Sequence, residues 1–123
     1  MEKKILVVDD QSHIRRAMDY TLRKAGYNVI LSKDGKEALE IIKGTNEIKL
    51  IFLDVMMPIM NGFELCKILK ESPQYKHIYI IMLTAKGENS DEELGFQCGT
   101  NEYMTKPFSP SAVVKKAKEI LGE

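Results

Sequence analysis

The sequence predicts an α/β domain in which a parallel sheet is covered by helices on both faces. Short apolar runs alternate regularly with longer segments whose apolar residues recur every three or four positions. Several of the apolar runs are continuous, which is typical of parallel strands that are buried on both faces. With 123 residues the chain is long enough for one domain with a hydrophobic core and too short for two.

Both kinds of element can be placed along the chain. The predicted strands lie at residues 5–8, 29–31, 50–53 and 78–83, with a weaker one around residues 103–104. The predicted helices lie at about residues 14–25, 34–44, 61–72, 90–99 and 109–121. Each of the last four opens with a residue whose side chain can accept a hydrogen bond from the first helical turn. These residues are Asp34, Asn61, Ser90 and Ser109.

Composition excludes several classes of protein. Lys plus Arg equals Asp plus Glu at 18 each, and this balance argues against a broad nucleic-acid footprint. No apolar run approaches the ~20 residues that span a bilayer, and the N-terminus lacks the apolar stretch of a signal peptide. Cys66 and Cys98 have no metal-ligand spacing and are expected to be buried, reduced thiols. We therefore expect a cytoplasmic protein without membrane insertion or direct nucleic-acid binding.

Polar residues follow the predicted strands. Asp9 and Asp10 follow the strand at 5–8, Asp54 the strand at 50–53, Thr84 the strand at 78–83, and Lys106 the last strand. The carboxyl ends of parallel strands lie at one edge of the sheet, where ligands bind. Two carboxylates about 4 Å apart repel by roughly 4 kcal/mol at an effective dielectric constant of 20. The cluster therefore predicts a bound cation, and oxygen ligands of this kind suit Mg²⁺.

The same residue types suit phosphoryl transfer. A carboxylate can act as a nucleophile and form an aspartyl phosphate, and a metal ion with a lysine can neutralise the charge of the transferred group. Taken singly, each residue could have an ordinary role as a loop residue, a strand-end hydroxyl or a solvated side chain, and Asp9 and Asp10 could simply cap the first helix. Their coincidence at the strand ends favours a functional site.

Four stretches of the chain together resemble response-regulator receiver domains, over essentially the full length. They are ILVVDD at residues 5–10, LDVMMPIMNG at 53–62, LTA at 83–85 and KPF at 106–108. The resemblance implies a flavodoxin-like, doubly wound (βα)5 sandwich with strand order 2-1-3-4-5. It also implies a phosphorylation-activated switch of a two-component system, with residues 1–123 forming the receiver domain and no effector domain following.

The resemblance implies a role for each site residue. Asp54 would be the phosphoacceptor. Asp9, Asp10 and Asp54 would bind Mg²⁺ together with the backbone carbonyl of Met56, and Lys106 would pair with a phosphoryl oxygen. A domain of this kind catalyses only its own phosphorylation and dephosphorylation, so we do not expect an enzyme that acts on other substrates.

Further residues are expected to transmit phosphorylation to the surface. Thr84 would donate its hydroxyl to another phosphoryl oxygen, and Tyr103 would then turn inward. Alternatively, Tyr103 could be a half-exposed edge residue without a switching role. Lys106–Pro107 resembles the family's cis peptide, and Gly62 would let the chain after the phosphoacceptor turn into the next helix.

The resemblance also implies the partners. A sensor histidine kinase or a histidine phosphotransfer protein would donate the phosphoryl group, and Arg15, Arg16 and Met18 are candidates for its docking face. An unidentified downstream protein would bind the surface formed by residues 86–103 and the fifth helix. We expect a stand-alone regulator of the chemotaxis type or a phosphorelay shuttle.

Three alternatives share parts of this pattern. A flavin- or nucleotide-binding domain would present N–H groups to phosphate after the first strand, where this chain has Asp9 and Asp10. An aspartyl-nucleophile phosphatase usually has a second Asp two residues past the nucleophile, where this chain has Met56. A degenerate receiver that acts only as a scaffold is disfavoured because the full set of site residues is present.

Overall fold

Five parallel strands form one sheet in the computed structural model, which describes residues 4–45, 47–57, 59–85, 99–106 and 108–122. The strand order is β2-β1-β3-β4-β5, as the resemblance implied. The strands are β1 (Lys4–Val8), β2 (Asn28–Ser32), β3 (Ile48–Asp54), β4 (Tyr79–Ala85) and β5 (Glu102–Lys106). The helices are α1 (Ser12–Lys24), α2 (Gly35–Gly44), α3 (Gly62–Glu71) and α5 (Pro110–Leu121). The helix predicted at residues 90–99 lies largely outside the described residues.

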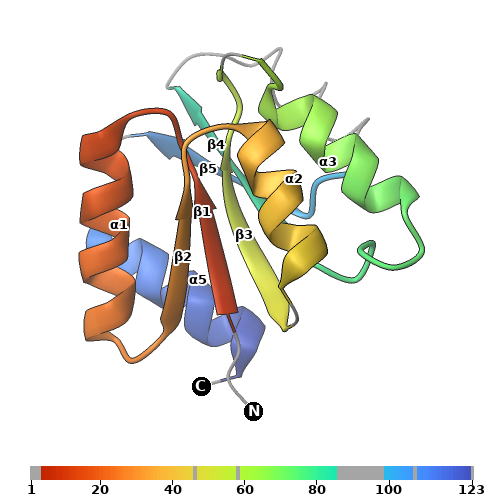
Figure 1. Cartoon of the computed structure of the whole chain (residues 1–123). Helices are drawn as coiled ribbons and strands as arrows, with labels where there is room; N and C mark the ends of the chain where they lie inside the picture. The colour runs from red at the N-terminus through yellow and green to blue at the C-terminus, as the bar shows by residue number, and fades with distance from the viewer. Residues whose placement is uncertain (1–3, 46, 58, 86–98, 107, 123) are drawn as a thin grey trace.

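Helices cover both faces of the sheet. α1 and α5 lie on one face, and α2 and α3 lie on the other (Figure 1). Successive side chains of a strand point to opposite faces, so β1 contributes to both halves of the core. Leu6 and Val8 pack on the α2 and α3 side, whereas Ile5 and Val7 pack on the α1 and α5 side. This two-sided burial explains the continuous apolar runs of the sequence.

Three of the predicted helix starts are confirmed by their side-chain caps. The Asp34 carboxylate accepts a hydrogen bond from the Glu37 backbone N–H at 2.8 Å. Asn61 and Glu64 cap each other's backbone N–H reciprocally, at 3.0 and 3.2 Å. The Ser109 hydroxyl accepts a hydrogen bond at the start of α5. These caps set where each helix begins after its strand. Within the described part of the chain, no helix has the length and apolar character needed to cross a membrane.

The sheet register brings the polar strand ends to one edge. Asp54 is the last residue of β3 and pairs with Leu83 of β4. β4 continues past its apolar run because Thr84 pairs with Thr105 of β5, and Lys106 closes the same ladder. The site therefore lies where β1, β3, β4 and β5 all end.

Candidate functional site

The acidic cluster lies at the carboxyl edge of the sheet. Asp9 follows β1 directly, Asp10 is its neighbour, and Asp54 ends β3. One carboxylate oxygen from each of these residues lies within 4.8 Å of the others. Asp9 and Asp54 are 0% and 6% exposed, whereas Asp10 is exposed to solvent. The structure thus brings together the three acidic residues selected from the sequence; their roles as ligands and phosphoacceptor stay predictions.

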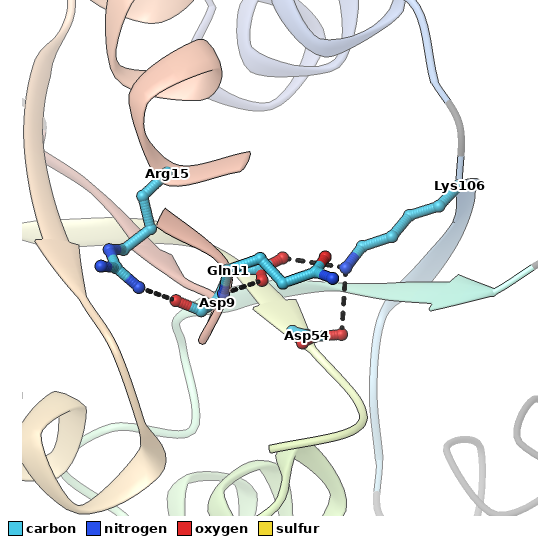
Figure 2. Close-up of polar contacts among 5 residues, drawn as sticks. All are labelled: Asp9, Gln11, Arg15, Asp54 and Lys106. Atoms are coloured by element: carbon cyan, nitrogen blue, oxygen red, sulfur yellow. Dashed lines mark hydrogen bonds and ion pairs between the residues drawn. The ribbon is translucent and has the colours of Figure 1, made fainter. Parts of the chain in front are cut away.

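Lys106 lies between two of these carboxylates. Its Nζ donates a hydrogen bond to Asp9 Oδ2 at 2.9 Å and another to Asp54 Oδ1 at 3.3 Å, as Figure 2 shows. The side chain is mostly buried, with 19% exposed. One ammonium therefore contacts two of the three carboxylates, and the cluster has a net charge of −2 when all four groups are ionised.

The backbone around Asp9 is held by three hydrogen bonds. Asp9 Oδ1 accepts from the Gln11 backbone N–H at 2.9 Å, and Arg15 Nη1 donates to the Asp9 carbonyl at 2.6 Å (Figure 2). The Asp9 N–H donates to the Ser32 carbonyl at 3.1 Å. Gln11 is the N-cap of α1 and makes no side-chain cap. One oxygen of Asp9 therefore supports the backbone at the start of α1 and the other contacts Lys106, whereas its role as a metal ligand stays a prediction.

Arg15 was not predicted to support the site. Its guanidinium reaches back from the first turn of α1 to a carbonyl six residues earlier. A sequence signal for this contact is lacking, because an arginine at the start of an amphipathic helix is more often solvated. The contact makes Arg15 a supporting residue of the loop that carries Asp9 and Asp10.

Burial and charge shift the pKa values of the two central groups. Burial, followed by the charge of Asp9, raises the pKa of Asp54 from 3.8 to about 7, although Lys106 opposes the rise. Burial alone would lower the pKa of Lys106, but its hydrogen bond to Asp9 and the charges of Asp54 and Asp9 raise it above the ordinary value. Ionising Asp54 adds a like charge where little water is present, so the ionised cluster favours an additional cation.

The donor set fits a small divalent cation. All three side chains offer carboxylate oxygens, which are the ligands that Mg²⁺ prefers. The net charge of −2 matches that of the ion with opposite sign, and the exposed Asp10 leaves the cluster accessible from solvent. Mg²⁺ commonly binds through one or two carboxylates and retains several waters, which this half-open arrangement allows.

The two predicted switch residues lie on neighbouring strands, Thr84 near the carboxyl end of β4 and Tyr103 near the start of β5. Thr84 is 3% exposed and follows Leu83, the partner of Asp54 in the β3–β4 register. Tyr103 on β5 is half-buried and packs against the core on the α2 and α3 side. The side chain of Met56 is 67% exposed. Residues 86–98 and Pro107 lie outside the described residues, so the proposed partner surface and the Lys106–Pro107 peptide stay predictions.

Gly62 is needed because two stretches of backbone approach each other closely. A Cβ at this position would lie 2.4 Å from the Asp54 carbonyl oxygen and 3.0 Å from the Val55 Cα. The Gly62 N–H donates a hydrogen bond to the Val55 carbonyl at 3.0 Å. The predicted turn into α3 is present, and its cause is the missing side chain, which lets α3 begin directly against the backbone that carries Asp54.

The predicted docking face on α1 needs one correction. Met18 is only 2% exposed and packs in the core with Leu22, so its assignment to an exposed docking face was wrong. Arg16 is exposed, and Arg15 is half-buried. The spacing of apolar residues in this helix predicts one stripe, formed by Ile14, Ala17, Met18, Thr21, Leu22 and Ala25, and of these Ala17 and Ala25 are exposed. Spacing of three and four residues defines an apolar stripe on the helix but not which part of the stripe faces the sheet. In α1 the large side chains of Met18 and Leu22 face the sheet.

A groove of about 940 Å³ lies between α1 and α5, away from the acidic cluster. Ala17, Tyr20 and Val114 are among its lining residues, and none of the three clustered carboxylates or Lys106 contributes to it. The candidate site is therefore identified by its chemistry and not by the size of a cavity.

Comparison with known proteins identifies the family. The model of the response regulator receiver domain matches residues 5–118. The chain therefore belongs to the response regulator receiver domains, the signalling domains of two-component systems, whose general function is a phosphorylation switch.

Individual relatives agree with this membership. The alkaline phosphatase synthesis transcriptional regulatory protein PhoP of Bacillus subtilis is 48% identical over 121 residues, which are 98% of this chain and 49% of the relative. The transcriptional regulatory protein ResD of the same organism is 45% identical, with 98% and 48% covered. The chain thus spans about half the length of the curated relatives it matches.

Solved structures support the fold over the whole chain. A putative response regulator from Chloroflexus aurantiacus is 36% identical with a TM-score of 0.91, and the match covers all of both chains. The chemotaxis protein CheY4 of Vibrio cholerae is 35% identical with a TM-score of 0.89, and the match covers 98% of this chain and 99% of that one.

Proposed function

We propose that this domain accepts a phosphoryl group on Asp54 in a Mg²⁺-dependent reaction. The donor would be the phosphohistidine of a sensor histidine kinase or of a histidine phosphotransfer protein. The observation that carries the proposal is the placement of Asp54 beside Asp9 and Asp10, with Lys106 within hydrogen-bond distance of two of the three carboxylates. Membership of the receiver family supports the same assignment.

The chemistry follows from this arrangement. A carboxylate oxygen of Asp54 attacks phosphorus, a P–O bond forms, and the P–N bond to the donor imidazole breaks, with its electron pair going to the departing nitrogen. Asp9, Asp10 and Asp54, with the backbone carbonyl of Met56, would hold Mg²⁺. When bound, Mg²⁺ supplies positive charge that favours the ionised form of Asp54 and neutralises the transferred group. Lys106 leaves its two carboxylates and pairs with a phosphoryl oxygen.

The output would be a change of surface that a protein partner recognises. Thr84 would bind the new phosphoryl oxygens and Tyr103 would turn inward, which alters the surface around β5 and α5. We do not propose turnover of external phosphoesters, because Met56 offers no acidic side chain two residues past the nucleophile. A cytoplasmic regulator or phosphorelay shuttle is the form we propose, and the similarity to the chemotaxis protein CheY4 supports it.

Intact-mass measurement tests the proposal directly. The chain is incubated with acetyl phosphate and Mg²⁺, and we expect one phosphoryl group on the unaltered chain and none on Asp54→Asn. Chelation of Mg²⁺ should prevent the modification. Asp19→Asn, which changes a partly exposed carboxylate on α1 in the same way, is the matched control and should be labelled normally. Labelling of Asp54→Asn, or labelling that survives chelation, would contradict the proposal.

A further inference from the structure

A strained and exposed isoleucine lies beside the phosphoacceptor. Ile59 is 77% exposed and belongs to the connection from β3 to α3, which starts directly after Asp54 at the edge where the strands end (Figure 1). Its φ is 71°, in the left-handed region that glycine and asparagine adopt readily and that β-branched residues rarely adopt. Burying an apolar side chain would stabilise the fold and offset the strain, but the side chain of Ile59 is exposed. An exposed apolar side chain in a strained conformation suggests a contact with another molecule.

Contacts hold the residues that follow Ile59. A Cβ at Gly35 would lie 2.6 Å from the Met60 carbonyl oxygen, so the start of α2 packs tightly against the residue after Ile59. Asn61 and Glu64 form the capping box of α3, and the Gly62 N–H donates to the Val55 carbonyl. The exposed side chain of Ile59 therefore directly precedes backbone that contacts with α2 and the end of β3 hold in place.

The position restricts what the other molecule can be. Phosphoryl transfer requires the phosphorus to come within about 3–3.5 Å of the Asp54 carboxylate, and that carboxylate is almost fully buried at the edge of the sheet. A small donor needs only the opening beside the exposed Asp10. A protein that carries phosphohistidine must lay its own surface across the edge, and the connection from Asp54 to α3 forms one border of that edge.

We propose that Ile59 is an apolar contact for the protein that delivers the phosphoryl group, and that this protein carries a matching apolar surface beside its phosphohistidine. The inference rests on the proposed phosphorylation of Asp54 and adds a determinant of donor recognition to it. Met56, which is 67% exposed in the same connection, extends the apolar character of this border. Ile59 contacts the donor protein and takes no part in the chemistry.

Two donors of different size separate recognition from chemistry. Initial rates of Asp54 labelling are measured with acetyl phosphate and with the autophosphorylated cytoplasmic portion of a histidine kinase chosen because it labels the unaltered chain. Ile59→Asn and Ile59→Gly both fit the left-handed backbone and remove the apolar side chain. Ile68→Gln is the matched control, because Ile68 is an exposed isoleucine (40%) within α3.

We expect both Ile59 variants to be labelled by the kinase about tenfold more slowly, the loss typical of one well-packed apolar anchor, and by acetyl phosphate at the unaltered rate. Ile68→Gln should match the unaltered chain with both donors.

Equal kinase rates for all chains would overturn the inference and leave the proposed function intact. A loss with both donors would also overturn it, because Ile59 would then act on the chemistry. Failure of the unaltered chain to be labelled by acetyl phosphate would instead refute the proposed function. Unfolding midpoints no lower than that of the unaltered chain would show that the variants fold.

Discussion

Replacing Asp54 with Asn is expected to stabilise the domain in the absence of metal. Burial, with the neighbouring charge of Asp9, raises the pKa of Asp54 from 3.8 to about 7. The folded state therefore retains a proton that the unfolded state has already lost between about pH 4 and pH 7. Stability falls as the pH rises through this window and is lower by a constant amount above it. Asn removes the ionisation and keeps the shape of the side chain.

The two pKa values give the size of the effect. Each pH unit between them corresponds to about 1.36 kcal/mol, so the rise from 3.8 to about 7 corresponds to at most about 4 kcal/mol. The substitution also removes the charged partner that Lys106 contacts at 3.3 Å, and this loss offsets part of the gain. We therefore expect a net gain in the free energy of unfolding of roughly 1–3 kcal/mol at about pH 8 and a gain near zero at about pH 4.

Urea denaturation across this pH range, with a chelator present, measures the difference. Asp19→Asn is the control, since Asp19 forms an exposed ion pair with Arg23 at 2.5 Å and should change stability by less than about 1 kcal/mol at any pH. Millimolar Mg²⁺ should stabilise the unaltered chain more than Asp54→Asn, because the cation binds the folded state through the carboxylate that the variant lacks. An Asp54→Asn chain that is less stable at about pH 8, or a gain that does not depend on pH, would refute the reasoning.

Three further predictions concern the described residues around the site and at the far end of the sheet. Lys106→Met should lower the unfolding free energy measured with chelator by about 3–5 kcal/mol, because it leaves buried carboxylates without a counter-charge. Mg²⁺ should recover part of this loss, and an unchanged unfolding midpoint would show that the ammonium does not stabilise the cluster. Gly62→Ala should lower the free energy of unfolding by roughly 1–3 kcal/mol in the same urea assay, because its Cβ would lie 2.4 Å from the Asp54 carbonyl oxygen. Gly44→Ala is the control and should be neutral or slightly stabilising, because no described atom lies within 4 Å of the added Cβ. Ultraviolet titration should find Tyr79 ionising near pH 12, above the ordinary 10, because burial and then the hydrogen bond to Glu102 at 2.7 Å raise its pKa to about 12; ionisation near pH 10 would contradict that contact.

Local signals in the sequence were sufficient for the positions of the described elements. Continuous apolar runs predicted buried parallel strands, and the side-chain caps at Asp34, Asn61 and Ser109 are present in the structure. Both signals are local, because capping depends on residues three positions apart and burial depends on the type of side chain. The grouping of Asp9, Asp10 and Asp54 then follows from topology, since parallel strands end at a common edge.

Tertiary contacts account for what the sequence could not predict. Met18 and Leu22 of α1 fill the core, as the helical spacing predicted, and the docking role suggested for Met18 did not follow from that spacing. The bond from Arg15 to the Asp9 carbonyl depends on how α1 is placed over β1. The positive φ of Ile59 lies beside backbone that packs against Gly35 of α2, a tertiary contact that no pattern of neighbouring residue types predicts.

The strand β5 connects the chemistry of the site to a surface. Lys106 at its end is held by two carboxylates, whereas Glu102 at its start accepts a hydrogen bond from the Tyr79 hydroxyl and forms an ion pair with Lys116 of α5. Among the described strands, β5 lies at one edge of the sheet and pairs only with β4, so it can shift with fewer broken bonds than β3, which has neighbours on both sides. If phosphorylation of Asp54 draws Lys106 toward a new anion, as proposed, the change acts on an edge strand that the contact between Glu102 and Lys116 links to α5. This arrangement is the physical reason why we place the proposed response on the β5 and α5 surface and not around the central strands.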